Sequence, residues 1–268
     1  QLCNGSYMYR NTTEIHIYEN YICIMCQHMS GKTVASVTIG DTTTQYDNIE
    51  QALQSVVDCT AEDKALVVMR SDADLGESYL TINSGVFTLD LNGFEVVGAN
   101  SEFGTICLAG TANVTLMDSG TTGKLIGSAY AALVLSGNAV ATVVSGTLEG
   151  PTEGDDSDDF GIYGKESSSL TILGGHISGC DFGVFLQENA IATISGGTIS
   201  GGKWDFHNYG SSKTTLTVGE HGVGASFPDG VSSAGKLLEN LLDEKSAFWY
   251  GDHMVILGSR DYHFTDGE

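Results

Sequence analysis

Apolar and polar residues alternate in short runs through the middle of the chain, and the runs repeat. The stretch "LTILGGHISG" at 170–179 returns 22 residues later as "ATISGGTISG" at 192–201. Weaker versions begin at Phe87, Val114, Ala141 and Leu216. This interval is too short for a domain, but it suits one coil of a solenoid, which buries its apolar side only against neighbouring coils.

Two features mark the same place in successive repeats. The first is a threonine that recurs every 22 to 29 residues, and the second is the phrase "DFGIY" at 159–163, "DFGVF" at 181–185 and "DFHNY" at 205–209. Each repeat therefore carries two strand-like runs, bounded by Gly, Ser, Asn or Asp. The recurring threonines are Thr88, Thr115, Thr142, Thr171, Thr193 and Thr217.

Stacking of these repeats predicts internal ladders of identical or similar side chains. No run between residues 80 and 230 has helical spacing, which favours an all-β fold, a right-handed parallel β-helix (solenoid) over residues 85–235. Glycines at the corners leave room for a positive φ or a close neighbouring backbone. We expect one ladder of Phe160, Phe182 and Phe206, a second of Leu148, Ile177 and Ile199, and corners at Gly146, Gly175 and Gly197.

Both ends of the solenoid are expected to be closed, because an open coil exposes apolar surface and strand edges. Residues 33–84 are expected to form a small α/β N-terminal cap, reading strand, turn, helix, strand. Asp47 or Asn48 can begin the helix, whose apolar positions have helical spacing. Residues 236–258 predict a helix-hairpin C-terminal cap with its turn at "YGDH" (250–253), followed by a tail or linker at 259–268. Capped ends favour a monomer. The apolar helix positions are Ile49, Ala52, Leu53, Val56 and Val57 in the first cap, and Leu237, Leu238, Leu241 and Leu242 in the second.

Composition and charge exclude several classes of partner. The chain has 268 residues with 35 Gly and 2 Pro, a formal net charge of −23 and a pI near 4.3. Binding to nucleic acid or to anionic lipid requires clustered Lys and Arg, so neither is expected. No run approaches the roughly 18 apolar residues of a membrane span, and no signal peptide begins at Gln1. The chain is expected to be a mature protein or a piece of a larger multi-module one.

The order of phrases resembles a known family of modules. "VTIGDTTTQYDNIEQALQSVVD", "ALVVMRSDADL", "TLDLNGFEVVG" and then repeated "TISGGTISG" resemble the pectate-lyase-like right-handed β-helix modules of large surface proteins in Gram-positive, often gut-dwelling, bacteria. The resemblance covers about residues 33–258. It implies an extracellular protein, secreted or on the bacterial cell surface, in which such modules serve as adhesin or stalk segments, often with no known enzymatic activity. The same fold also houses polysaccharide lyases and glycoside hydrolases.

Candidate catalytic residues are few. Lyases on this fold need a basic side chain, yet Arg10, Arg70 and Arg260 lie outside the repeated coils. The lysines within them, Lys124, Lys165, Lys203 and Lys213, share no column. Hydrolases need two carboxylates about 5–10 Å apart, which stacked Asp159, Asp181 and Asp205 could supply at about 5 Å. Their position also suits solvent-facing turns, and we favour that interpretation.

The sequence therefore predicts a non-catalytic surface module that binds host protein or glycan through the long face of the β-helix. The alternative is a polysaccharide-active enzyme that uses the stacked aspartates. The candidate binding ledge combines aromatic and hydrogen-bonding side chains, although Trp204 also suits a cover over the last coils. It comprises His176, Thr198, Trp204, His207 and Tyr209.

Metal binding has two candidates and a simpler alternative for each. Carboxylates in the acidic loop "EGDDSDDFG" could hold calcium, or the loop is merely solvated. Thiols in the N-terminal segment, residues 1–32, could hold zinc with a histidine, but we favour a disulfide or free thiols. The calcium candidates are Asp155, Asp156, Asp158 and Asp159, and the zinc candidates are Cys3, Cys23, Cys26 and His28.

Two further features are a pair of cysteines within the coils and the column of threonines. Cys107 and Cys180 are expected to replace small apolar residues in separate coils, without a bridge between them. An ice-binding face would need a second threonine column two residues after the first. Those positions carry Asp90, Met117, Val144, Leu173 and Ser195, so the threonines are better explained as β-branched residues that favour strands.

Overall fold

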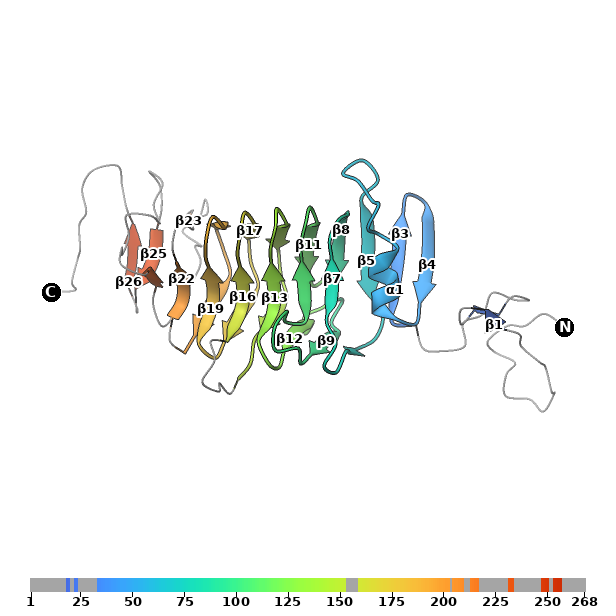
Figure 1. Ribbon diagram of the computed structural model, residues 1–268, viewed down its shortest axis with the longest axis horizontal. Helices are drawn as coiled ribbons and strands as arrows, with labels where there is room; N and C mark the ends of the chain where they lie inside the picture. The colour runs from blue at the N-terminus through green and yellow to red at the C-terminus, as the bar shows by residue number, and fades with distance from the viewer. Residues whose placement is uncertain are drawn as a thin grey trace.

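The computed structural model describes residues 33–152, 159–202 and 204–209, and also the strands at 18–19, 22–23, 213–216, 231–233, 247–250 and 253–256. The protein is all-β with parallel sheets, as the sequence predicted. Its strands lie side by side along the long axis of the molecule, from β3 and β4 near the N-terminal end to β22 and β23 (Figure 1).

Three sheets run the length of this stack, and we name each by the side chains on its outer side. The nine-stranded threonine sheet has the order β23 (Lys213–Leu216), β20 (Ile191–Ile194), β17 (Ser169–Ile172), β14 (Val140–Val143), β11 (Asn113–Met117), β8 (Val86–Asp90), β5 (Ala65–Met69), β3 (Ala35–Ile39) and β4 (Thr42–Tyr46). The seven-stranded aromatic sheet has the order β24 (Val231–Ser233), β22 (Trp204–Asn208), β19 (Phe182–Leu186), β16 (Phe160–Gly164), β13 (Ala131–Leu135), β10 (Ile106–Leu108) and β7 (Leu80–Ile82).

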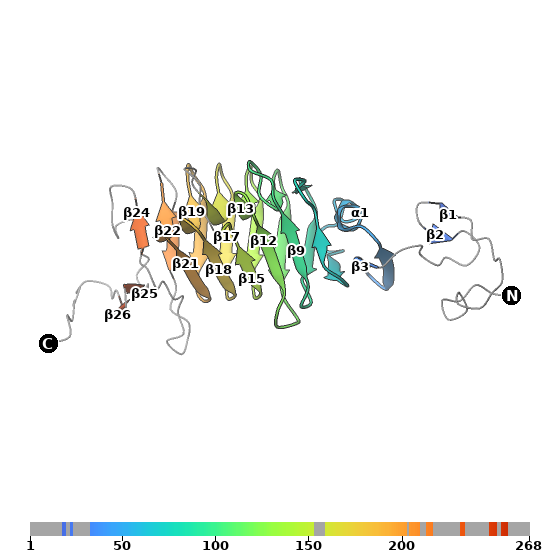
Figure 2. The same ribbon diagram turned by 90° about the horizontal axis from the view of Figure 1, so that it is seen from below.

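The six-stranded polar sheet has the order β21 (Thr198–Gly201), β18 (His176–Gly179), β15 (Thr147–Glu149), β12 (Lys124–Gly127), β9 (Glu95–Gly98) and β6 (Ala73–Asp74). The chain visits the threonine, polar and aromatic sheets in turn, and each such set of three strands is one layer of the stack (Figure 2). A layer thus has three strands, not the two expected. The phrase "LTILGGHISG" contributes to β17 and β18, with Gly174 and Gly175 between them. Parallel stacking begins at Ala65, earlier than the expected residue 85.

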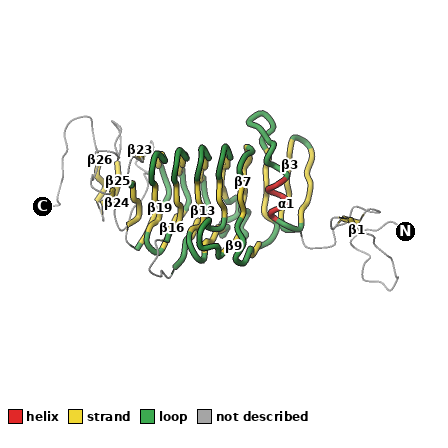
Figure 3. Tube along the Cα trace, in the orientation of Figure 1, coloured by secondary structure: helices red, strands yellow, loops and turns green. Residues whose placement is uncertain are grey.

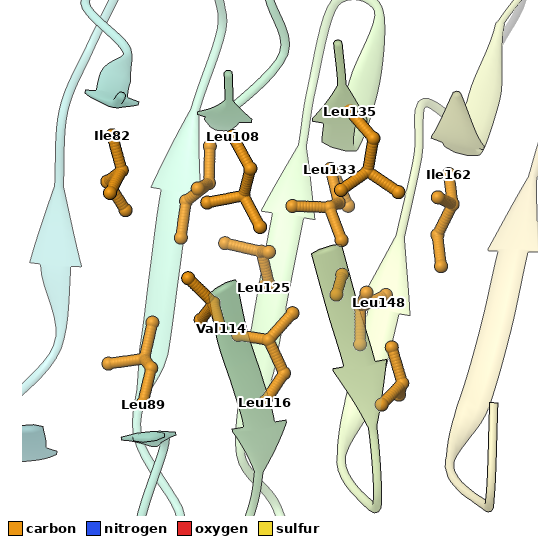
Figure 4. Packing of buried hydrophobic residues seen from close by; sticks show 14 of the residues in the cluster. Ile82, Leu89, Leu108, Val114, Leu116, Leu125, Leu133, Leu135, Leu148 and Ile162 are labelled. Carbon is orange, nitrogen blue, oxygen red and sulfur yellow. The ribbon is translucent and has the colours of Figure 1, made fainter. Parts of the chain in front are cut away.

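The core lies between the three sheets. Leu116 of the threonine sheet, Leu125 and Leu148 of the polar sheet and Leu133 of the aromatic sheet are almost fully buried and point into one shared space (Figure 4). The expected ladder of Leu148, Ile177 and Ile199 is confirmed, because the three pair in register. Each is completely buried. Apolar burial repeated in every layer is therefore the main stabilising contribution to the stack.

Glycines form the predicted corners between the threonine and polar sheets. Gly146, Gly175 and Gly197 have φ of +92°, +90° and +87°, values that only glycine adopts readily. The neighbouring layers also leave no room for a side chain, since a Cβ on Gly175 would lie 2.8 Å from the carbonyl oxygen of Gly146. The corner therefore requires a glycine in each of these repeats.

Two ladders are shifted by two residues from their expected register in the last described layer. Phe160 pairs with Phe182, but Phe182 pairs with Trp204. Phe206 pairs instead with Val184, so the single column of three phenylalanines is wrong, although all three are buried. Likewise the threonine column ends at Thr215, not Thr217. Side chains alternate with a period of two, so a shift of two preserves the pattern and cannot be detected from it.

The N-terminal end of the stack holds the only α-helix of the described residues, α1 (Ile49–Gln54), beside β3 (Figure 3). Asn48 begins it, and its side-chain oxygen accepts a 2.7 Å hydrogen bond from the Glu50 amide. Ile49, Ala52 and Leu53 are buried, as predicted. The expected order lacked one element, since the polar run at 42–46 is β4, an edge strand paired antiparallel with β3.

The predicted hairpin near the C-terminus is present. β25 (Ala247–Tyr250) and β26 (His253–Ile256) pair antiparallel, with Tyr250 opposite His253. A further antiparallel pair, β1 (Tyr18–Glu19) and β2 (Ile22–Cys23), lies in the N-terminal segment. The expected helix around Leu237–Leu242 and the tail at 259–268 lie outside the described residues.

Candidate functional site

The aromatic sheet carries a second hydrophobic cluster on its outer side, separate from the core. Its members are buried or half-buried and come from four strands and the turns before them. Strand alternation explains the division, because Ile162 and Val184 belong to the core whereas the next residues, Tyr163 and Phe185, belong to the outer cluster. We call this surface the aromatic face. It comprises Tyr79, Cys107, Tyr130, Ala131, Val134, Phe160, Tyr163, Phe182 and Phe185, together with the adjoining rings of Phe103, His207 and Tyr209.

Phe160 and Phe182 belong to this outer cluster, not to the inward column expected from the sequence. The cause is the glycine that follows each of them. A Cβ on Gly161 would lie 2.8 Å from Ile177, and one on Gly183 would lie 2.6 Å from Ile199. Both glycines thus face the core, so alternation turns the preceding phenylalanine outward. The outer position is nevertheless shielded from solvent, since Phe160 is only 4% exposed.

The rings form a continuous stack along the axis of the molecule. Phe160 and Phe182 stack at 5.6 Å between centroids, and Phe185 and His207 at 5.0 Å with planes 14° apart. Tyr209 follows at 6.4 Å from both Phe185 and His207. These separations lie in the favourable range for aromatic pairs. Most ring faces are therefore covered by other rings, whereas Tyr209, 54% exposed, offers much of its ring to solvent.

Charged groups flank the rings at the turn after β16. The Lys165 ammonium lies 6.0 Å from the centroid of Tyr163. Burial raises the pKa of the Tyr163 hydroxyl, and the carboxylates of Glu188 and Glu166 raise it further. Burial likewise raises the pKa of the Cys107 thiol, so this cysteine stays protonated and behaves as a small apolar residue.

The two glutamates at this turn are fixed by backbone amides. The Glu166 carboxylate accepts a 2.7 Å hydrogen bond from the Gly137 amide, and the Glu188 carboxylate accepts one of 3.1 Å from the Glu166 amide. Each side chain thus reaches back one layer, and the two carboxylates follow one another beside the aromatic face. Positioned carboxylates next to rings can accept hydrogen bonds from hydroxyl groups of a ligand.

The structure divides the ledge predicted from the sequence between two sheets. His176 and Thr198 pair in register on the polar sheet, where His176 is exposed. His207 and Tyr209 lie at the C-terminal end of the aromatic face. Trp204 is part of β22, but its side chain lies outside the described residues. The five residues therefore do not form one ledge: His176 pairs with Thr198 on the polar sheet, and His207 lies beside Tyr209 on the aromatic face.

The three candidate catalytic aspartates are buried, so the favoured interpretation as solvent-facing turn residues is wrong. Asp159, Asp181 and Asp205 are 2%, 8% and 0% exposed, which excludes solvent-facing turns. Asp159 and Asp181 share a column, because each precedes one of the paired residues Phe160 and Phe182. Asp205 lies outside that column, since it follows Trp204, the partner of Phe182. The Asp205 carboxylate accepts a 3.0 Å hydrogen bond from the Gly201 amide. A buried carboxylate that is bonded to the backbone, as that of Asp205 is, serves the local fold and is not placed to flank a bound glycosidic bond.

The candidate metal ligands fall largely outside the described residues. Asp155, Asp156 and Asp158 of the acidic loop do so, as do Cys3, Cys26, His28 and the Cys23 side chain. Among the residues that the structure describes, no cluster of three His, Cys, Asp or Glu side chains is suited to a metal ion. Cys59, Cys107 and Cys180 are free thiols.

A polar hollow lies at the opposite end of the aromatic face from Tyr209. Its volume is about 250 Å³, and it lies between α1 and β7. Tyr79, whose ring stacks on Phe103 at 4.7 Å, forms part of its wall. The other lining residues are Glu50, Leu53, Gln54, Leu80 and Thr81.

Sequence reasoning missed the centre of the aromatic face. Tyr163 and Phe185 stand last in "DFGIY" and "DFGVF", so an aromatic residue recurs there at an interval of one layer. Lys165, Glu166 and Glu188 follow them in the turns. Tyr163 and Phe185 pair in register, so treating the fifth position of each phrase as an outward column would have located the face.

In the part of the chain that the structure describes, no helix has the length and apolar character needed to cross a membrane. In comparisons with known proteins, no family model, no curated protein and no solved structure matches the chain.

Proposed function

We propose that the chain is a non-catalytic binding module of a secreted or cell-surface bacterial protein, and that it binds a neutral glycan on the aromatic face near Tyr209. One observation carries this proposal. Half-exposed Tyr163, Phe185 and His207 lead to the exposed ring of Tyr209 along one face of a rigid sheet. Aromatic rings held in place beside hydrogen-bonding groups are typical of ligand sites.

The fold supports this role as a right-handed parallel β-helix with closed ends. Successive strands enter the threonine, polar and aromatic sheets in constant order, and crossovers between parallel strands are right-handed in almost all proteins. In this proposal the antiparallel pair of β3 and β4, together with α1, serves as the cap at one end, and the antiparallel pair of β25 and β26 serves as the cap at the other. Closed ends leave the long faces for binding.

The charges favour a neutral ligand. The protein carries a formal net charge of −23, and Glu166 and Glu188 lie beside the rings with Lys165 as the accompanying cation. A uronate or sulfated glycan would be repelled by these carboxylates. Neutral sugar hydroxyls can donate to them, while the sugar's apolar side packs on Tyr209. Binding should therefore depend little on ionic strength.

The test is a titration with neutral polysaccharides and with polygalacturonate as the acidic comparison, by affinity electrophoresis and calorimetry. We expect binding to a neutral glycan, weakened about tenfold or more in Tyr209→Ala, as for an aromatic anchor. His176→Ala, on the polar sheet, is the matched control and should bind normally. Binding that is lost in His176→Ala but kept in Tyr209→Ala would move the site to the polar sheet.

Product analysis of the same mixtures separates binding from catalysis. New reducing ends or unsaturated uronates would establish the alternative, a polysaccharide lyase or glycoside hydrolase. A folded protein that binds none of these glycans and releases no product would contradict the proposal.

A further inference from the structure

The outer side of the threonine sheet has a composition unlike that of the protein as a whole. Twelve outward side chains on β11, β14, β17 and β20 and the residues just after them include no charged group. We call these twelve the threonine face. They are Asn113, Thr115, Met117, Val140, Thr142, Val144, Ser169, Thr171, Leu173, Ile191, Thr193 and Ser195.

Apolar exposure also gathers here. Of the six large hydrophobic side chains that the structure shows as exposed, Val144, Leu173 and Ile191 lie on this face, and Leu66 lies two strands before β11 in the same sheet. Leu173 and Ile191 are 51% and 48% exposed. Grouped apolar exposure on a soluble surface indicates contact with another molecule.

We propose that the threonine face is the interface of a weak, reversible dimer, and that its occupant is the threonine face of a second copy. Charge is the first reason. Two copies that each carry −23 repel one another wherever carboxylates face each other. The threonine face has no carboxylate of its own, and the Lys64 ammonium donates a hydrogen bond to Thr115 on it, so two copies can approach there. The proposal is independent of glycan binding and departs from the monomer expected from the sequence.

Matching dimensions are the second reason. Thr115, Thr142, Thr171 and Thr193 pair in register in successive layers, so they form a row with the strand spacing of about 4.8 Å. A second copy presents rows with the same spacing. Side chains of the two faces can therefore interdigitate along the whole stack, as in sheets packed face to face.

The area of the threonine face limits the affinity of the proposed dimer. The four strands β11, β14, β17 and β20, each about five residues long, offer roughly 300 Å² per copy. The total of about 600 Å² is below the roughly 1,200 Å² of stable complexes, so the dimer is populated only at high concentration. Chains held close together on one surface would reach such concentrations.

Sedimentation velocity of the whole chain, from micromolar to near-millimolar concentration and from low to high salt, tests this inference. We expect a dimer that forms more readily at high salt, because salt screens the repulsion between the two negative copies. An interface built on ion pairs would show the opposite dependence.

Thr142→Lys, which puts an ammonium at the centre of the face, should raise the dissociation constant at least about tenfold, since the charge must be buried. Thr147→Lys is the matched control: both positions are half-exposed strand threonines of the same layer, and Thr147 lies on the polar sheet. Leu173→Lys provides a second variant at an exposed site. Circular dichroism and thermal unfolding show that each variant is folded.

A monomer under every condition would overturn the proposal. So would a dimer that Thr142→Lys and Leu173→Lys leave intact, which would indicate pairing elsewhere, for example through the edge strand β4. Equal weakening of the dimer by Thr142→Lys and Thr147→Lys would also overturn the proposal, because the effect would then come from the added charge and not from its position on the threonine face.

Discussion

The aromatic face and the threonine face are built on the same layers and the same strand spacing, yet their outer surfaces differ. On the aromatic face, side chains reach across layers and bury one another, so that Phe182 is only 7% exposed. On the threonine face, the paired threonines of successive layers are short, and Thr193 remains exposed. Side-chain size at outward positions thus decides whether a sheet's outer side becomes a second small core or a flat surface open to solvent.

The largest expected difference between the two faces is in stability. Phe182→Ala should lower the free energy of unfolding by about 3 kcal/mol, because it leaves a cavity among Phe160, Phe185 and His207. Thr171→Ala, at a half-exposed position of the threonine face, should change it by about 0.5 kcal/mol or less. Equilibrium urea unfolding of both variants measures the difference. Equal losses would show that the aromatic cluster contributes no more than a ladder of surface threonines.

The next prediction concerns what turns the phenylalanines outward. Gly183→Ala should cost about 2–3 kcal/mol, because its Cβ would lie 2.6 Å from Ile199 and from the Asp205 carbonyl oxygen. Gly40→Ala is the control, since Gly40 has a positive φ of +55° but no atom within 4 Å of the added Cβ. Its cost should be about 1 kcal/mol, from backbone conformation alone. If the two variants unfold at the same urea concentration, crowding at Gly183 does not set the direction of Phe182.

Those glycines also show how far the sequence could lead. Repetition of "GGxIS" predicted the ladder of Leu148, Ile177 and Ile199 and the corner glycines, because each side chain there meets its counterpart one layer away. The direction of Phe160 and Phe182 could not be predicted. Alternation is interrupted after Gly161 and Gly183, because each glycine and the residue that follows it both face the core. Only contact with Ile177 and Ile199 on another sheet reveals that the glycines face inward.

The candidate site was less predictable than the fold for a related reason. His176 and His207 belong to sheets on different sides of the stack, and no sequence interval shows where one sheet ends and the next begins. The aspartates of the "DF" phrases resembled turn residues, yet all three are buried. The Asp205 carboxylate bonds to the Gly201 amide, and composition does not distinguish such a buried polar residue from a polar residue in solvent.

The smallest expected effect is a change in one tyrosine's titration, and it tests how far the aromatic face is shielded from water. Tyr163 has a raised pKa, first from burial and then from Glu188 and Glu166. A raised pKa means that the folded state holds this proton above the ordinary value of 10.0, whereas the unfolded chain releases it there. The contribution to stability is complete below that pH and is lost as the pH rises through the folded pKa.

The difference in ultraviolet absorbance between the protein and its Tyr163→Phe variant, followed through alkaline pH, isolates this hydroxyl from the other tyrosines. We expect the Tyr163 hydroxyl to titrate at higher pH than a free tyrosine, and at a lower pH than in the parent protein when Glu188→Gln removes the larger of the two carboxylate effects. Glu149→Gln, on the polar sheet, is the control and should leave the titration unchanged, because Glu149 pairs with Lys124 at 3.5 Å. Burial is the larger cause, so Glu188→Gln should lower the pKa only in part. A hydroxyl that titrates normally while the fold is intact would mean that water reaches the aromatic face freely, and the contrast with the threonine face would then be one of shape alone.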